Sequence, residues 1–144
     1  MILIIDDCIE TKIGIFKEWL ERAGLQSKCA KTLEEATALF ESNIDSIDAI
    51  ILDYSFPVSE ENTAVQSENK LPNGIVFLKK YEMKLQLKRI PLIINTDGDE
   101  EYRDKYLRST RYFSNDADVL YKSPGKQPLS SITPVLATKI IQRN

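Results

Sequence analysis

Short, unbroken apolar runs recur along the chain, separated by longer segments with helical spacing. Three of these runs, rich in β-branched residues, lie at 2–5, 49–52 and 91–94. Runs that are too short for a helix and lack polar–apolar alternation are typical of strands in a parallel sheet covered on both faces. Two weaker strands fit the same spacing, at 26–30 and 118–121. We therefore predict five strands.

Amphipathic helices are predicted between and after these strands. Gly24 is a typical helix end, Thr32 with Glu35 forms a capping-box pattern, and Asn73-Gly74 precedes the third helix. The apolar positions of the five helices are Ile9, Ile13, Phe16, Leu20 and Ala23; Ala36, Leu39 and Phe40; Ile75, Phe77, Leu78 and Tyr81; Tyr102, Tyr106 and Leu107; and Leu136, Ile140 and Ile141. This alternation predicts an α/β fold with a doubly wound parallel sheet, a (βα)5 three-layer sandwich.

The segment 58–72 interrupts the compact pattern, because it is polar, rich in Glu, Asn and Ser, and without periodicity. Loops in α/β units usually have about 2 to 6 residues, so a longer one is either functional or mobile. Its apolar content is too low for a second domain. We predict one domain over residues 1–144, with an extended polar loop at 58–72 that is mobile when no partner is bound.

Composition narrows the possible functions. With 144 residues, 42% of them hydrophobic, the chain can bury a core without disulfides or structural metal. The net charge of −3 does not favour nucleic acid or a membrane surface. The absence of histidine excludes Ser-His-Asp catalysis and His-ligated zinc. No apolar run suits a signal peptide or a membrane span, so we expect a soluble, cytoplasmic protein.

Polar side chains follow the predicted strands where each one ends. Asp6 and Asp7 follow the first strand, Asp53 the third, Thr96 the fourth and Lys122 the fifth. One such Asp is usually a turn former or a helix cap. Three carboxylates at one point, however, repel each other unless a cation lies among them, and an oxygen-only site suits Mg²⁺. A nearby hydroxyl and ammonium would equip the site for phosphoryl transfer to a carboxylate.

This ordered set of residues resembles the receiver domain of two-component response regulators, and the resemblance covers nearly the whole chain. The residues that carry it are Asp6-Asp7, Asp53 with Pro57 four positions on, Thr96 and Lys122. The resemblance implies a flavodoxin-like fold with strand order 2-1-3-4-5.

The resemblance also implies a role for each residue. Asp53 would accept a phosphoryl group from a sensor histidine kinase or a phosphotransfer protein. Asp6 and Asp7 would hold Mg²⁺ together with Asp53 and the main-chain carbonyl of Ser55. Lys122 would contact a phosphoryl oxygen, and Thr96 would move toward the phosphoryl group and carry the signal outward.

Signalling in this family runs through protein contact, at a face formed by the fourth helix, the fifth strand and the fifth helix. The resemblance therefore implies a downstream protein partner at that face. The net charge of −3 gives no reason to expect nucleic acid or a membrane as a partner. Because the sequence ends at Asn144, without room for an effector domain, we expect a stand-alone receiver. The loop before the third helix is about a dozen residues longer than is usual in the family.

Three positions depart from the family pattern. Ser123 separates Lys122 from Pro124, Val119 stands where an aromatic residue is common, and acidic Asp97 follows Thr96. These departures leave open a pseudoreceiver, an interaction module that works without phosphorylation. A third alternative is a Mg²⁺-dependent hydrolase with Asp53 as nucleophile. The haloacid dehalogenase pattern, however, would require a second Asp where Ser55 stands.

Overall fold

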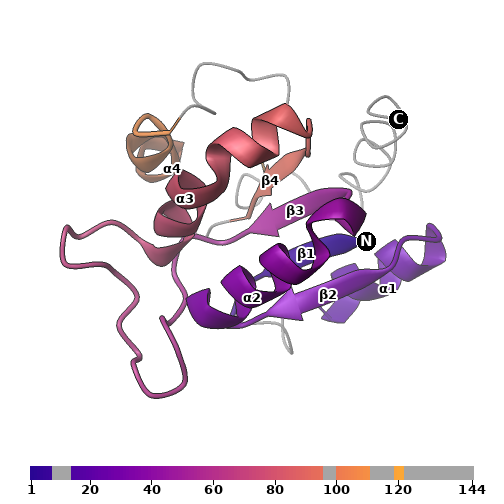
Figure 1. The fold of residues 1–144 in the computed structure, drawn as a ribbon, viewed down its shortest axis with the longest axis horizontal. Coiled ribbons are helices and arrows are strands. Elements are labelled where there is room, and N and C mark those ends of the chain that lie inside the picture. The colour runs from indigo at the N-terminus through magenta and orange to yellow at the C-terminus, as the bar shows by residue number, and fades with distance from the viewer. Residues whose placement is uncertain (8–13, 96–99, 111–118, 122–144) are drawn as a thin grey trace.

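The computed structural model describes residues 1–7, 14–95, 100–110 and 119–121 (Figure 1). Five parallel strands form one sheet in the order β2-β1-β3-β4-β5. The strands are β1 (Ile2–Ile5), β2 (Ser27–Ala30), β3 (Ala49–Leu52), β4 (Leu92–Ile94) and β5 (Val119–Tyr121). The predicted doubly wound sheet and its strand order are confirmed. The predicted fifth helix lies outside the described residues.

Four α-helices and one 3-10 turn are found among the described residues. They are α1 (Gly14–Arg22), α2 (Leu33–Asn43), η2 (Ile44–Ser46), α3 (Asn73–Leu87) and α4 (Glu100–Leu107). Thr32 caps α2, because its hydroxyl accepts a hydrogen bond of 3.1 Å from the Glu35 N–H. Gly24, at a φ of 77°, ends α1 as predicted. No helix within the described residues is both long and apolar enough to cross a membrane.

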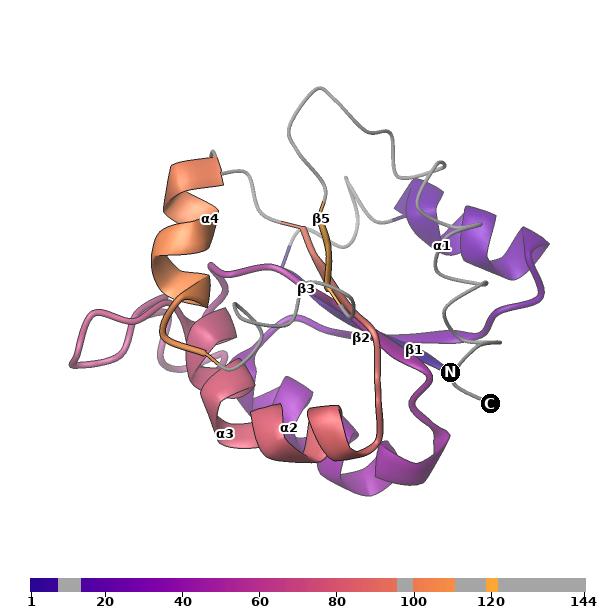
Figure 2. The same cartoon turned by 90° about the horizontal axis from the view of Figure 1, so that it is seen from above.

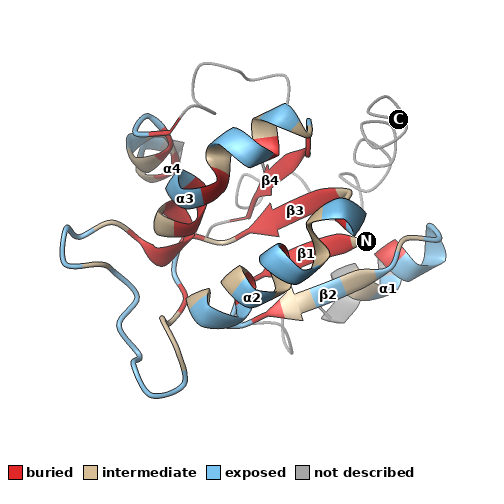
Figure 3. Cartoon of the chain, in the orientation of Figure 1, coloured by how far each residue is buried: buried red, intermediate tan, exposed pale blue. Residues whose placement is uncertain are grey.

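Helices cover both faces of the sheet, which gives three layers (Figure 2). Alternate strand residues point to opposite faces. On one face Leu3 and Ile5 join the larger apolar core with residues of α2, α3 and α4. On the other face Ile2 and Ile4 pack with Leu20 of α1. The four residues of β1 and of β3 are therefore all buried (Figure 3), as expected for unbroken apolar runs.

The segment 58–72, called the arm from here on, extends away from the sheet between β3 and α3 (Figure 1). Hydrogen bonds give it local structure. The N–H of Val58 donates to the Ala64 carbonyl, and the N–H of Ser67 donates to the Leu71 carbonyl at 2.9 Å. Most of its side chains are exposed, as its polar composition requires. The mobility expected of this loop stays a prediction.

Candidate functional site

The strands end in register at the carboxyl edge of the sheet. Their last paired row is Ala30, Ile5, Leu52, Ile94 and Tyr121. The N–H groups just past three strands still donate to the neighbouring strand at 2.9 to 3.0 Å: Asp6 to Ala30, Asp53 to Ile5 and Asn95 to Leu52. The ladder thus continues one residue beyond each strand, so Asp6 and Asp53 leave the sheet side by side.

The three predicted aspartates meet at this edge. One carboxylate oxygen each from Asp6, Asp7 and Asp53 can be chosen so that all three atoms lie within 4.8 Å of one another. Asp6 is buried, Asp53 half-buried and Asp7 exposed. Ligand oxygens around Mg²⁺ lie at about 2.1 Å from the metal, so two of them are at most about 4.2 Å apart. The three carboxylates therefore lie close to the spacing that one hard cation requires, and the exposed Asp7 leaves the cluster open to solvent on one side.

Backbone and charge constrain the cluster further. The Asp53 carboxylate accepts a hydrogen bond of 2.7 Å through Oδ1 from the N–H of Tyr54, which fixes the side chain near its own backbone. On the neighbouring strand, burial raises the pKa of the Cys29 thiol, and the negative charge of Asp6 adds to the rise against Lys17 and Lys31. A raised pKa disfavours the reactive thiolate, which agrees with a structural cysteine.

Gly74, the second residue of α3, touches the backbone of Asp53. Its N–H donates to the Tyr54 carbonyl at 2.9 Å. A Cβ at this position would lie 2.2 Å from the Asp53 carbonyl oxygen and 2.8 Å from the Tyr54 Cα, closer than non-bonded atoms approach. Only glycine lets α3 begin directly against the residue that carries the central carboxylate.

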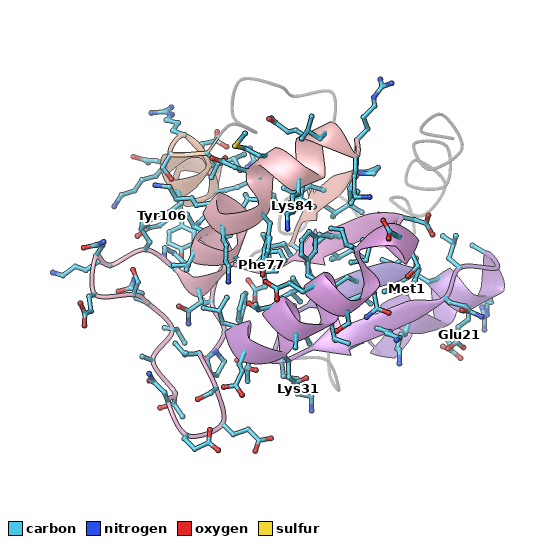
Figure 4. The ribbon with its side chains drawn as sticks, viewed as in Figure 1. Met1, Glu21, Lys31, Phe77, Lys84 and Tyr106 are labelled. Carbon is cyan, nitrogen blue, oxygen red and sulfur yellow. The ribbon has the colours of Figure 1, made fainter. Side chains whose placement is uncertain are left out.

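Tyr54 links the same point of the chain to α4. Its ring is fully buried, and its hydroxyl donates to the carbonyl of Arg103 at 2.8 Å. The ring centroids of Tyr102 and Tyr106 lie 5.9 and 6.2 Å from that of Tyr54 (Tyr106 is labelled in Figure 4). The residue next to Asp53 is thus held against α4 by one hydrogen bond and two aromatic contacts.

Several predicted site residues lie outside the part of the chain that the structure describes: Thr96, Asp97, Lys122 and the Ser123-Pro124 pair. Val119 belongs to β5 and pairs with Leu92 of β4. Ser55 is exposed, two residues after Asp53. Its carbonyl as a metal ligand stays a prediction.

The sequence analysis missed two features of this edge. Asn73 and Gly74 are predicted only to precede the third helix, whereas they are its first two residues. The signal that could have indicated a close backbone approach is a glycine at the start of the helix that follows β3 and the strand-end carboxylate of Asp53. The second feature is a pocket of about 230 Å³ between the arm and the start of α2, lined by Thr32, Glu34, Glu35, Ser59, Glu60 and Glu61.

Comparisons with known proteins identify the fold. No protein-family model matches the sequence, and no curated protein matches it. Solved structures do match. A response regulator receiver domain protein from Clostridium thermocellum has 24% identity and a TM-score of 0.65, over 99% of this chain and 94% of that one. The receiver domain of the Francisella response regulator 1452 has 21% identity and a TM-score of 0.67, over 99% and 98%.

A third solved structure shows the same likeness. The CheY-like response regulator receiver domain protein from Methanospirillum hungatei JF-1 has 16% identity and a TM-score of 0.66, over 99% of this chain and 94% of that one. At these identities the likeness concerns architecture. The chain therefore has the fold of response regulator receiver domains along nearly its whole length.

Proposed function

We propose that this chain is a phosphorylatable receiver that takes a phosphoryl group onto Asp53 and signals by protein–protein contact. One observation carries the proposal: Asp6, Asp7 and Asp53 bring carboxylate oxygens within 4.8 Å of one another at the carboxyl edge of a receiver-type sheet. Ligand sites of open α/β sheets lie at this edge. Three carboxylates collected there favour a cation-dependent reaction of an anionic substrate.

The chemistry would proceed at the Asp53 carboxylate. One of its oxygens attacks the phosphorus of a phosphohistidine, a P–O bond forms, and the P–N bond breaks with its electron pair leaving on the donor. Asp6, Asp7, Asp53 and the Ser55 carbonyl would hold Mg²⁺, which supplies positive charge to the phosphoryl oxygens when bound. Lys122 would contact a phosphoryl oxygen, and Thr96 would donate its hydroxyl to another.

The partners in this proposal are a sensor histidine kinase or a phosphotransfer protein as donor, and a downstream protein as receiver of the signal. The contacts of Tyr54 support an output surface that includes α4. They join the residue after Asp53 to Arg103, Tyr102 and Tyr106 of that helix. The cytoplasm, where such kinases expose their phosphohistidine, is the compartment that this role requires.

Intact-mass measurement after incubation with Mg²⁺ and acetyl phosphate tests the proposal. We expect the wild-type protein to gain the mass of one phosphoryl group and Asp53→Asn to gain none. Asp45→Asn is a matched control, because this aspartate is 90% exposed and lies on η2, away from the cluster. It should label like the wild type. Labelling of Asp53→Asn would place the acceptor elsewhere.

The same incubation separates the alternatives when free phosphate is measured beside the intact mass. A pseudoreceiver would bind its partner but take no label, and Val119 at a position where receivers commonly carry an aromatic residue is the observation that keeps this alternative open. A Mg²⁺-dependent hydrolase would release phosphate continuously from the donor without retaining a stable label.

A further inference from the structure

Asn73 is buried at the root of the arm with only 1% of its surface exposed, although its side chain is polar. The side-chain Nδ2 group donates two hydrogen bonds, to the Phe56 carbonyl at 2.7 Å and to the Ala64 carbonyl at 2.9 Å. Its backbone N–H donates to the Val65 carbonyl at 3.0 Å. One residue at the start of α3 therefore binds both the segment that leaves β3 and the chain that returns through the arm.

Asn73 and Gly74 together hold the carbonyls on both sides of Ser55. Gly74 donates its N–H to the carbonyl of Tyr54, and Asn73 donates its amide to the carbonyl of Phe56. Because each peptide unit is planar, the Ser55 carbonyl can turn only by rotation of the one peptide unit that lies between these two held units.

The segment after Ser55 is held from the other side by α2. The carbonyls of Pro57 and Val58 accept hydrogen bonds of 2.9 Å from the N–H groups of Leu33 and Glu34, in the first turn of that helix. The Phe56 side chain is fully buried in the larger apolar core. The Asn73 amide bonds come from a side chain, whereas the α2 contacts come from backbone N–H groups. A substitution of Asn73 can therefore remove the amide bonds and leave the backbone donors in place.

We propose that Asn73 is a positioning residue for the metal site: its buried amide orients the Ser55 carbonyl and ties the arm to that orientation through Ala64. The inference rests on the Mg²⁺ site of the proposed function. Hydrogen bonds made directly to a metal ligand typically change metal affinity by about 10- to 100-fold, and Asn73 acts one peptide unit further out. Because a single carbonyl ligand is concerned, we expect the low end of that range.

The test uses Mg²⁺ alone, without a phosphodonor. Calorimetric titration of the folded protein should show Asn73→Ala binding Mg²⁺ about tenfold more weakly than the wild type. Asn62→Ala is the matched control. It removes the hydrogen bond that the Asn62 side chain accepts from the Ala64 N–H but leaves the Phe56 contact intact, so its affinity should equal that of the wild type.

A measurement on the wild type does not depend on whether the variants fold. In an NMR titration with Mg²⁺, the side-chain amide signal of Asn73 should shift with the same midpoint as the backbone signals of Asp6 and Asp7. An Asn73 signal that does not move while the aspartate signals do would overturn the inference, as would an Asn73→Ala affinity equal to that of the wild type. If the wild type binds no Mg²⁺ at all, the metal site of the proposed function fails instead.

Discussion

Replacing Gly74 with alanine perturbs the placement of Asp53 without touching any carboxylate. The added methyl group would lie 2.2 Å from the Asp53 carbonyl oxygen and 2.8 Å from the Tyr54 Cα. Non-bonded heavy atoms are most favourable at about 3.5–4.0 Å, so the start of α3 and the end of β3 must separate by about 1 Å. Both contacts are with backbone, which cannot swing aside as a flexible side chain can.

The expected loss of stability follows from three contributions. Overpacking of a tight contact costs about 1–3 kcal/mol. Weakening the hydrogen bond from the Gly74 N–H to the Tyr54 carbonyl costs about 1 kcal/mol. Alanine in place of glycine near a helix start returns up to about 1 kcal/mol. We expect a net destabilisation of about 2 kcal/mol, which lowers the Tm by roughly 6 °C in a domain of this size.

The effect on phosphorylation should exceed what the lost stability explains. Misplacing a reacting group by about 1 Å can cost about 100-fold in rate, so acetyl phosphate labelling of Gly74→Ala should slow by about 10- to 100-fold. The assay follows the intact mass of the wild type and of Gly74→Ala over time. It is run at a temperature at which urea unfolding curves show that both proteins are folded in the absence of urea.

Gly24→Ala is the control for a destabilised but undistorted site. Gly24 has a φ of 77° and no atom within 4 Å of the added Cβ, so alanine there introduces backbone strain of about 1 kcal/mol and no clash. It lies before β2, toward the opposite edge of the sheet from the aspartates. Its labelling rate should match the wild type. A Gly74→Ala variant that labels at the wild-type rate would refute the idea that this contact positions Asp53.

Three further predictions concern elements around the site. Tyr54→Phe should cost about 1 kcal/mol and speed amide exchange in α4, because the hydrogen bond to the Arg103 carbonyl is lost. Burial and the hydrogen bond to Glu41 raise the pKa of Tyr81 to about 12, whereas it is about 10 in the unfolded chain. The free energy of unfolding, measured with urea, should therefore fall between pH 10 and pH 12, and it should fall less in Tyr81→Phe. Arg89→Gly should add about 0.5 kcal/mol in the same assay, because φ there is 55°.

Most of the fold could be predicted from the sequence because its signals are local. The apolar runs at 2–5 and 49–52 are buried on both faces, and such runs occur almost only in parallel sheets with helices on each side. Thr32 was predicted to cap a helix and does so. Strand ends differ by a single residue from the predicted ones at 26, 91 and 118, where pairing rather than residue type decides the boundary.

The aspartate cluster could be predicted for a related reason. In a parallel sheet the carboxyl ends of neighbouring strands share one edge, so carboxylates that directly follow β1 and β3 must approach each other. The contacts of Asn73 and Gly74 could not be predicted in this way. They join residues about 10 to 20 positions apart, and no periodicity records which loop carbonyl a buried amide meets.

The length of the arm matters less to this site than the few contacts at its root. Closing a flexible loop costs only about 0.6 kcal/mol more for each doubling of its length. A long insertion between β3 and α3 is therefore inexpensive, provided that its ends stay where a short loop would put them. The hydrogen bonds of Gly74 to Tyr54 and of Asn73 to Phe56 meet that condition, since both lie at the base of the arm.

The arm can therefore vary in length and sequence while Asp53 and Ser55 keep their places. A variant shortened within 59–63 should accordingly keep its Mg²⁺ affinity as long as the Ala64 carbonyl still reaches Asn73.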